Sequence, residues 1–428
     1  MDLLQEARAI INDVDAQMAE LFVQRMRAAE MVAQYKKAHG MPILDPEREE
    51  AVIRNGSARV EDPALKAYYV DFMRSTMALS RQYQQKLLHN AKEGVTVELG
   101  KNSYVITIQR GALSHADDYL KLDRKVLVVT DSGVPTEYAR AVAACCQSPV
   151  IVTVPQGESS KSLPNFETLC RTMLRHGFTR TDCVVAVGGG VVGDLAGFAA
   201  SAFLRGIDFY NIPTTVLSQV DSSVGGKAAI DLDGIKNCVG AFHQPKAVLI
   251  DPDVLKTLPE RQVASGLAEA VKMAVTFDES LLSLFEKGDP LSCIDRIIAA
   301  SVQIKAAVVK ADERESGLRR VLNFGHTIGH GIETAAGLYH GECVALGMLP
   351  MCSQALRPRV QAILQRLNLP TSCTASPDAV WAAIAHDKKR SGDTITVVYA
   401  PKAGSFELRA MPIGELKETV YAFLGGKG

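Results

Sequence analysis

The sequence of 428 residues has almost no net charge and no long apolar run. Its 47 basic and 48 acidic side chains leave a formal charge of −1, which gives no indication of nucleic acid or a polyanionic surface as a partner. Any site for anions must therefore be a local cluster of lysine and arginine. No stretch reaches the roughly 20 apolar residues that span a bilayer, so we expect no membrane partner.

The cysteines form no recognisable framework. Nine are scattered along the chain without a C-x-x-C pair, and Cys145 and Cys146 are adjacent, a poor geometry for a structural disulfide. Such usage is typical of free thiols in a reducing compartment. Residues 1–10 lack the basic start and apolar run of a signal peptide. We therefore expect a cytoplasmic protein.

Glycine is scarce in residues 1–88, which contain only Gly40 and Gly56. From Leu4 to Val32 apolar residues recur in alternating steps of three and four, and this periodicity predicts an amphipathic helix. The region therefore reads as helix almost throughout.

Two further helices are expected in the same region. Asp45 followed by Pro46 predicts a helix start, with an acid at the N-cap and proline in the first turn. A third helix is expected from about Pro63 to Leu88. Residues 89–94 have no periodicity and are interpreted as a linker, so residues 1–88 are predicted to form an all-α, three-helix module.

From Val95 onward short apolar runs alternate with helical segments, which favours a mostly parallel α/β sheet over residues 95–260. The runs are KVLVVTD, PVIVTVP, CVVAVGGG and AVLIDP. Residues 261–428 are mainly helical and end with a β-like pair, TITVVYA and SFELRAM. The chain is therefore predicted to be multidomain.

Long polar side chains interrupt the apolar face of the first predicted helix. Arg25 lies in the apolar register, and Lys36 follows 11 residues later, about three turns along nearly the same face. One interpretation is that both alkyl stems cover the core while the charged ends reach water. Polar side chains converging from several helices, however, usually mark a site in a bundle core. The other converging positions are Asp45, Arg48, Glu49, Ser80 and Gln84.

Residues 1–88 resemble the all-helical chorismate mutase family in the segments ARAII, VQRMRAAE, QYKKAHG, DPEREE and ALSRQYQ. The resemblance implies rearrangement of chorismate to prephenate, a reaction that requires a dianion held in a compact conformer with charge near the breaking ether bond. It implies catalytic roles for Lys36, Glu49 and Gln84. It implies substrate-binding roles for Arg8, Arg25, Asp45, Arg48 and Ser80.

Arg8 poses a geometric problem. It is 17 residues from Arg25, about 25 Å along a helix and about 100° around it. One small substrate cannot contact both on the same straight helix. Either Arg8 is a surface residue, or it enters the site of a partner subunit in an intertwined dimer, as in the family; we favour the dimer.

A glycine-rich segment follows the third apolar run of the α/β region. Its spacing, Gly188-x-Gly190-x-x-Gly193, lets backbone amides approach a pyrophosphate at a helix start. A packing turn is the alternative, because glycine turns after strands are common. Asp131 at the end of an earlier run, and Thr214-Thr215 after another, support a nucleotide site.

Two further groups of residues carry candidate chemistry. Asp221-Ser-Ser-Val-Gly-Gly-Lys227 and then Lys236-Asn237 indicate anion capture by loop amides and lysines, although solvated surface lysines are the alternative. Later, nitrogen and carboxylate donors occur at spacings that suit a divalent metal. Spacing alone favours His326 and His330, at i and i+4, as its ligands. The later group comprises Glu269, Lys272, Arg319, Asn323, His326, His330 and His340.

Residues 95–428 resemble 3-dehydroquinate synthase in GGGVVGDLAGFAAS, QVDSSVGGK, RRVLNFGHTIGHGIE, YHGECVALGM and other segments. The resemblance implies that Glu269, His326 and His340 are the metal ligands. It implies cyclisation of 3-deoxy-D-arabino-heptulosonate 7-phosphate to 3-dehydroquinate with release of phosphate, with NAD used catalytically and zinc or cobalt polarising the ring oxygen. The 95–260 domain would then bind NAD, and the 261–428 domain the metal and substrate.

The same resemblance assigns the remaining site positions. Catalytic roles are implied for Asp221, Lys227, Lys272, Lys305, Arg319 and His330. Substrate contacts are implied for Arg205, Lys236, Asn237, Asn323 and a lysine of the pair Lys388 and Lys389. NAD contacts are expected from Asp131, Gln156, Gly157, Glu158, Lys161, Gly189, Gly190, Val191, Val192, Gly193, Asp194, Thr214, Thr215, Lys227 and Lys236.

Three alternatives remain at this point. The large module could be another sugar-phosphate cyclase that makes an inositol- or valiol-like ring, or a metal-dependent polyol dehydrogenase that releases NADH. Residues 1–88 could bind prephenate or chorismate to regulate the synthase instead of catalysing. Because both resembled families dimerise, we expect a homodimer or a higher homo-oligomer with small-molecule substrates.

Overall fold

The computed structural model describes residues 2–38, 44–90, 94–388 and 393–425, and the chain divides into two compact units, Met1–Glu93 and Gly94–Gly428. The predicted fold class is confirmed: a three-helix module precedes an α/β region and a mainly helical region. None of the helices in those ranges combines the length and apolarity needed to cross a bilayer.

The first unit contains α1 (Leu3–Ala38), α2 (Pro46–Ser57) and α3 (Pro63–Asn90). The predicted N-cap of α2 is confirmed, because the Asp45 carboxylate accepts a hydrogen bond of 3.0 Å from the backbone N–H of Arg48. Helix α3 runs two residues into the segment interpreted as a linker, and the next element begins at Gly94.

Much of the apolar stripe of α1 is exposed. Towards its C-terminal end α1 buries Met26, Ala29 and Ala33 in the packing with α3. The N-terminal part leaves Ile10 61% and Leu21 62% exposed. The other large apolar side chains exposed there are Leu3, Leu4, Ile11, Val14, Met18, Phe22 and Val23. A single chain therefore leaves exposed to water the apolar face of α1, which the periodicity predicts to be buried.

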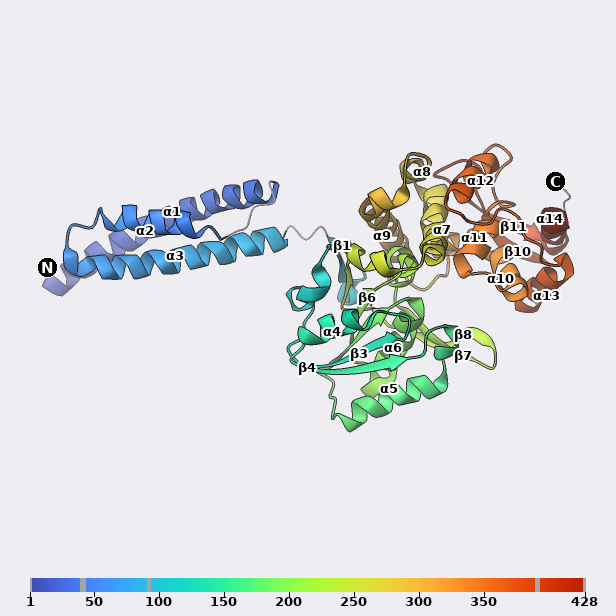
Figure 1. The fold of residues 1–428 in the computed structure, drawn as a ribbon, viewed down its shortest axis with the longest axis horizontal. Helices are drawn as coiled ribbons and strands as arrows, with labels where there is room; N and C mark the ends of the chain where they lie inside the picture. Colours follow the sequence, from blue (N-terminus) through green and yellow to red (C-terminus); the bar gives the residue numbers. More distant parts are fainter. Residues whose placement is uncertain (1, 39–43, 91–93, 389–392, 426–428) are drawn as a thin grey trace. The chain divides into compact units, whose positions relative to one another are not determined.

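The second unit is built on a seven-stranded sheet in the order β1-β2-β9-β6-β5-β3-β4, in which every neighbouring pair except β1 and β2 is parallel. Figure 1 labels β1, β3, β4 and β6 of this sheet. Its strands are β1 (Gly94–Val97), β2 (Tyr104–Ile108), β3 (Lys125–Asp131), β4 (Ser148–Val154), β5 (Cys183–Gly188), β6 (Asp208–Pro213) and β9 (Ala247–Ile250). Helices α4 (Thr136–Ala144), α5 (Leu163–Arg175) and α6 (Gly190–Ala202) cover it, and β7 (Lys227–Leu232) and β8 (Ile235–Phe242) form a separate hairpin.

Two cores hold the sheet between its helices, because successive strand side chains point to opposite faces. Leu127 and Val129 of β3 join the core formed with α5 and α6. Val126 and Val128 join the core formed with α4. The central strands are thus buried on both faces, which explains why they read as continuous apolar runs.

A third core gathers the helical region together with β1 and β2. The helices are α7 (Glu260–Phe277), α8 (Glu279–Glu286), α9 (Ile294–Ala311), α10 (His326–Ala336), α11 (His340–Met348), α12 (Arg357–Arg366), α13 (Pro377–Lys388) and α14 (Ile413–Gly425). Strands β10 (Thr394–Tyr399) and β11 (Glu407–Pro412) pair in antiparallel fashion, as the late β-like pair predicts.

Glycines allow α7, α10 and α11 to approach one another closely. A Cβ atom at Gly341 of α11 would lie 1.8 Å from the carbonyl oxygen of Ser265 on α7. A Cβ at Gly347 would lie 2.0 Å from the carbonyl oxygen of Gly325, and one at Gly329 of α10 would lie 2.9 Å from that of Cys343. The glycines near the histidines therefore serve backbone contact between helices.

This packing makes Gly347→Ala a specific test. The added methyl group would clash with backbone, and we expect the free energy of unfolding, measured by urea denaturation, to fall by about 1–3 kcal/mol. Gly414→Ala on α14 is the matched control, because a Cβ there meets nothing within 4 Å. That variant should be neutral or slightly stabilised. Equal stability of the two variants would contradict the proposed helix contact.

Candidate active sites

The predicted nucleotide-binding residues gather at the carboxyl edge of the parallel strands. Asp131 ends β3, the segment from Gln156 to Lys161 follows β4, and Thr214-Thr215 follows β6. The glycine-rich segment connects β5 to α6, whose N-cap residue Gly189 provides no side-chain cap. The first amides of α6 therefore remain available to an anion, in the position where open α/β sheets bind nucleotides.

Close contacts explain the glycines of this turn. A Cβ atom at Gly188 would lie 2.5 Å from Val192, and one at Gly193 would lie 3.1 Å from the side chain of Asn211 on β6. Ser222 faces the same turn, 3.1 Å from the Cβ position of Gly190, and in the described part of the chain its buried hydroxyl has no hydrogen-bond partner. A buried hydroxyl without a partner is consistent with an absent ligand.

Lys161 lies at the centre of a small charged group at this edge. Its side chain is 3% exposed, and its Nζ is 3.0 Å from Asp194 Oδ2 and 3.2 Å from Glu158 Oε1. Burial raises the pKa of Asp194 to about 6, although Lys161 opposes the shift. Lys161 also donates to the side-chain oxygen of Asn237 on β8. This network fixes the β7–β8 hairpin against the nucleotide edge.

A cavity of about 600 Å³ extends from this edge to the helical region. Asp194 lines one end of it, and His326 and His340 line the other. Four cations line it as well, which is the local cluster that a chain of near-zero net charge requires for anion binding. They are Lys227, Lys272, Lys305 and Arg319.

Acidic side chains hold these cations in place. Lys305 of α9 forms an ion pair with Asp221, and Lys272 of α7 lies 3.2 Å from the other oxygen of the same carboxylate. Burial, with Arg319 nearby, holds the pKa of Lys305 well below its usual value. Arg319 is 2% exposed and donates to the backbone oxygens of Gly225 and Glu313.

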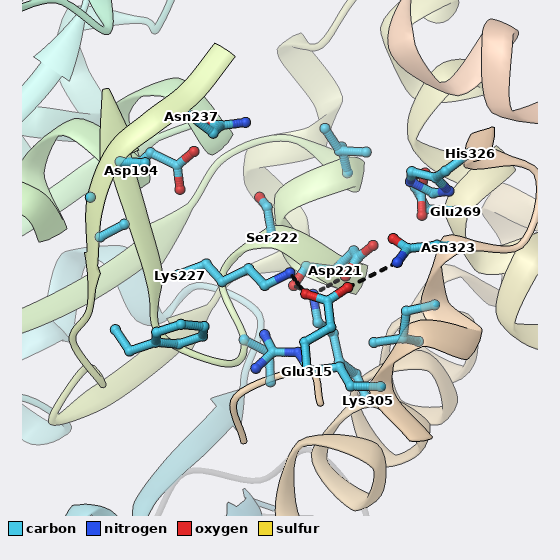
Figure 2. A pocket seen from close by; sticks show the side chains of 18 of the residues that line it. Asp194, Asp221, Ser222, Lys227, Asn237, Glu269, Lys305, Glu315, Asn323 and His326 are labelled. Atoms are coloured by element: carbon cyan, nitrogen blue, oxygen red, sulfur yellow. Dashed lines mark hydrogen bonds and ion pairs between the residues drawn. The ribbon is translucent and has the colours of Figure 1, made fainter. Parts of the chain in front are cut away.

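Glu315 reaches into the cavity from the loop that follows α9. Figure 2 shows Lys227 and Asn323 pointing towards its carboxylate. Lys227 forms an ion pair with it, and Asn323 Nδ2 donates to Oε1 at 2.9 Å. The backbone of Glu315 has φ of 60°, a strained conformation for a non-glycine residue. The Glu315 carboxylate thus occupies the position towards which the Lys227 ammonium and the Asn323 amide point.

Three predicted metal donors lie around one point at the other end of the cavity. Glu269 of α7, His326 of α10 and His340 of α11 each offer an atom within 4.8 Å of the other two. Oε1 of Glu269 is 3.6 Å from Nε2 of His326 and 3.4 Å from Nε2 of His340. Tetrahedral bonds of about 2.0–2.2 Å to zinc would place ligand atoms about 3.3–3.6 Å apart, so the spacing fits.

The carboxylate of Glu269 also fits a metal ligand by its surroundings. It is fully buried, and its Oε2 forms an ion pair with Lys272 of the same helix. Burial opposes its charge, yet Lys272 and the two imidazoles hold its pKa well below the usual value. A buried carboxylate kept ionised by its cationic neighbours is suited to binding a metal ion.

The two histidines are held by their other ring nitrogens. Nδ1 of His326 is 3.1 Å from the backbone oxygen of Phe324, and Nδ1 of His340 is 3.0 Å from Oε2 of Glu333. Burial and Lys272 lower the pKa of His326 well below its usual value. Burial would lower that of His340 too, but Glu269 and Glu333 raise it to about 9. A metal ion would therefore displace a proton from His340.

The remaining predicted positions lie elsewhere. His330 is on α10 with its ring centroid 5.2 Å from that of His326, but it is not in the group formed around Glu269. Lys236 lies on β8 and forms an ion pair with Glu333. Arg205, exposed with φ of 71°, is not among the described residues that line the cavity. Lys389 lies outside the described residues, as does the side chain of Lys388.

Only some of the predicted mutase residues lie together in the first unit. Ser80 and Gln84 are buried on α3, 3.5 Å apart, and Arg25 of α1 is half-buried. Arg25 Nη1 and Gln84 Oε1 are buried atoms for which the described residues provide no partner, as expected where a polar ligand would bind. Lys36 is half-buried and Arg48 is exposed. Arg8 is exposed on the same continuous helix as Arg25, which leaves it remote from that group.

The sequence did not point to three charged residues that pair with predicted site residues: two carboxylates and one arginine. Glu315 and Glu333 bind the candidate substrate lysines, and Arg81 of α3 forms an ion pair with Glu49 of α2. Lys236 and Glu333 are 97 residues apart in the chain, so spacing gave no signal. Position 81 directly follows Ser80, and its proximity to the predicted site residues was an available signal.

These features define a class of protein: an enzyme in which a nucleotide-binding sheet faces a helical domain that carries a three-donor metal cluster. Two family models match consecutive parts of that unit. The 3-dehydroquinate synthase N-terminal family matches residues 151–265, and the 3-dehydroquinate synthase C-terminal family matches residues 266–390. Chorismate mutase type II matches residues 7–85.

Curated relatives agree with these matches. The 3-dehydroquinate synthase of Symbiobacterium thermophilum is 42% identical over 337 residues, covering 72% of this chain and 94% of the relative. That of Latilactobacillus sakei is 41% identical over 338 residues, covering 74% and 95%. The chain therefore belongs to the 3-dehydroquinate synthase family, fused to an N-terminal chorismate mutase type II module.

Solved structures support the same architecture. A 2-epi-5-epi-valiolone synthase from Streptomyces hygroscopicus, solved with NAD⁺ and Zn²⁺ bound, is 26% identical with a TM-score of 0.69, covering 76% of this chain and 98% of that one. A 2-deoxy-scyllo-inosose synthase is 26% identical with a TM-score of 0.66, covering 77% and 100%.

Proposed function

We propose that the second unit converts 3-deoxy-D-arabino-heptulosonate 7-phosphate to 3-dehydroquinate and phosphate, with NAD and a divalent metal as cofactors. The observation that carries this proposal is the single cavity that joins the nucleotide edge to the metal cluster. Asp194 lines it beside the glycine-rich turn, and Glu269 and His326 line it at the other end. A substrate in this cavity could contact both cofactors at once.

We assign domain boundaries on the same basis. Residues 95–260 form the NAD-binding part, and residues 261–428 form the metal- and substrate-binding part. Solved relatives of this fold bind NAD⁺ with Zn²⁺ or Co²⁺, which supports both cofactors. When bound, NAD would take up and return a hydride while the metal acts as a Lewis acid on the ring oxygen.

The cations of the cavity would bind the phosphate and carboxylate of the substrate. Lys227 of β7 and Asn323 of η8 (Leu318–Asn323) point to the same part of the cavity (Figure 2), and Arg319 of η8 also lines it. The carboxylate of Glu315 holds two of these groups, and an anionic substrate would compete with it for them. Asp221 keeps Lys272 and Lys305 directed into the cavity.

Other assigned residues act at the edges of this cavity. His330, exposed beside the metal cluster on α10, could exchange a proton with the substrate or its leaving phosphate. Lys236 and Asn237 of the β7–β8 hairpin lie between the nucleotide edge and α10. We retain Arg205 and the Lys388–Lys389 pair as substrate-binding predictions.

The synthase assignment predicts phosphate release that depends on metal. Purified full-length protein with NAD⁺ and Zn²⁺ should release phosphate from the heptulosonate, stop after chelation, and produce no net NADH. Glu269→Gln should reduce the rate at least about 10²-fold, because the metal loses its only carboxylate in the cluster. Glu418→Gln, an exposed acid on α14, is the matched control and should keep the wild-type rate.

Other outcomes of this assay identify the rivals. Net NADH formation would indicate a polyol dehydrogenase. Turnover of a hexose or heptose phosphate in place of the heptulosonate would indicate a cyclase that makes another ring. Either result would overturn the proposed reaction.

We further propose that the first unit rearranges chorismate to prephenate within a homodimer. Arg25, Lys36, Arg48, Ser80 and Gln84 would hold the dianion, and the unpartnered atoms of Arg25 and Gln84 support this role. Glu49 would be positioned by its ion pair with Arg81. The exposed apolar stripe of α1 is the face that a second copy would cover. In such a pairing Arg8 would enter the partner's site.

Arg8→Ala tests the shared site. We expect mutase activity to fall at least about 10²-fold, because a bidentate carboxylate contact is lost, while the helical content and the dimer persist. Arg27→Ala on the same helix, also exposed, is the matched control and should keep activity. Unchanged kinetics of Arg8→Ala, or a monomer by light scattering, would contradict the arrangement.

We propose a cytoplasmic location for the protein. All nine cysteines are free thiols, and five of them are only partly buried. Free thiols persist in a reducing compartment.

A further inference from the structure

Glu333 connects two parts of the candidate synthase site. It lies on α10, and its side chain is 19% exposed. Oε2 is 3.0 Å from Nδ1 of His340 on α11, and Oε1 is 2.7 Å from Nζ of Lys236 on β8. One carboxylate thus links a candidate metal ligand to a candidate substrate-binding lysine from the α/β region.

The hydrogen bond determines how His340 can act. With Nδ1–H donated to Glu333, the lone pair of a neutral imidazole is on Nε2, which lies 3.4 Å from Glu269 Oε1. His326 has the same arrangement, but its Nδ1 meets the neutral backbone oxygen of Phe324. A carboxylate partner makes an imidazole a stronger donor to a metal than a carbonyl partner does. His340 is therefore the ligand whose strength depends on a side chain.

We propose that Glu333 is a positioning residue that fixes His340 as an Nε2 metal ligand and couples this ligand to Lys236. The inference rests on the proposed synthase function. Glu333 touches neither substrate nor metal in this role; it acts through the two side chains that it holds.

The alternative role for Glu333 is that of a metal ligand. His330, Glu333 and His340 also form a group whose donor atoms lie within 4.8 Å of one another, so Glu333 could itself ligate a metal. One fact opposes that role. A neutral His340 ring offers only one lone pair, which cannot serve two metal ions.

The contact with Lys236 gives the arrangement a second consequence. An anion bound by Lys236 would compete with Oε1 of Glu333 for the ammonium group. Substrate binding at β8 and the donor strength of His340 would then be linked through one carboxylate. Lys236→Met leaves the hydrogen bond between Glu333 and His340 in place and removes the competing ammonium, so it should shift metal affinity in the opposite direction to Glu333→Gln.

The test is a Co²⁺ titration of the metal-free, full-length protein, followed by calorimetry and by the visible absorption spectrum of the bound ion. We expect Glu333→Gln to bind one Co²⁺ per chain with 10- to 100-fold weaker affinity and an altered spectrum. Glu333→Asp, which restores the charge, should recover part of the affinity. Glu418→Gln should match the wild type, and Lys236→Met should bind Co²⁺ more tightly than the wild type.

Two results would overturn the inference. One is an affinity and spectrum of Glu333→Gln equal to those of the wild type. The other is a second Co²⁺ equivalent in the wild type that disappears in Glu333→Gln, which would make Glu333 a ligand. Should Glu333→Gln fail to fold, the same comparison is made with Glu333→Asp. Failure of the wild type to bind Co²⁺ or to release phosphate would instead overturn the proposed function.

Discussion

The close approach of α7, α10 and α11 is the constraint on which the candidate synthase site depends. Each helix contributes one donor of the metal cluster, namely Glu269, His326 and His340. The donor atoms lie 3.4–3.6 Å apart, and the helix backbones beside them approach more closely than a Cβ atom at the glycines would allow. Gly341, Gly325 and Gly347 provide that approach. The conformational cost of glycine in or beside helices is thereby balanced by a preorganised metal site.

A second constraint is the balance of charge within the cavity. Its lysines and arginine would repel one another in a poorly solvated space, and the chain provides carboxylates for them. Asp221 serves Lys272 and Lys305, Glu315 serves Lys227, and Glu333 serves Lys236. These acids hold the cations at the space that an anionic substrate would occupy. The site is thus organised before substrate arrives.

Much of this architecture could be predicted from the sequence, because it is encoded locally. The buried strands β3 and β5 follow continuous apolar runs, and the cap of α2 follows from Asp45 and Pro46. The edge strand β1 is only four residues long and has no such run, so the sequence does not predict it. The metal donors illustrate the limit of spacing: it favoured His326 with His330, whereas the structure groups His326 with Glu269 and His340. Helix direction and the glycine contacts decide that choice, and neither is visible in an i, i+4 count.

The roles of Glu315 and Glu333 show where local reasoning stops. Each binds a lysine about 90 residues away or more, and neither belongs to a repeated pattern of acids. The tertiary fold alone brings Glu315 to the cavity and Glu333 to His340 and Lys236. In the first unit, likewise, the periodicity of α1 gives its apolar face correctly, but a single chain leaves much of that face exposed.

The central claim is that Glu269, His326 and His340 together hold one divalent metal at the end of the substrate cavity. The most direct measurement is anomalous scattering at the zinc edge from crystals of the zinc-loaded, full-length protein. The account predicts one strong peak per chain at about 2.0–2.2 Å from an oxygen of Glu269 and from Nε2 of both histidines. A peak between His330, Glu333 and His340, or none at the cavity, would contradict it.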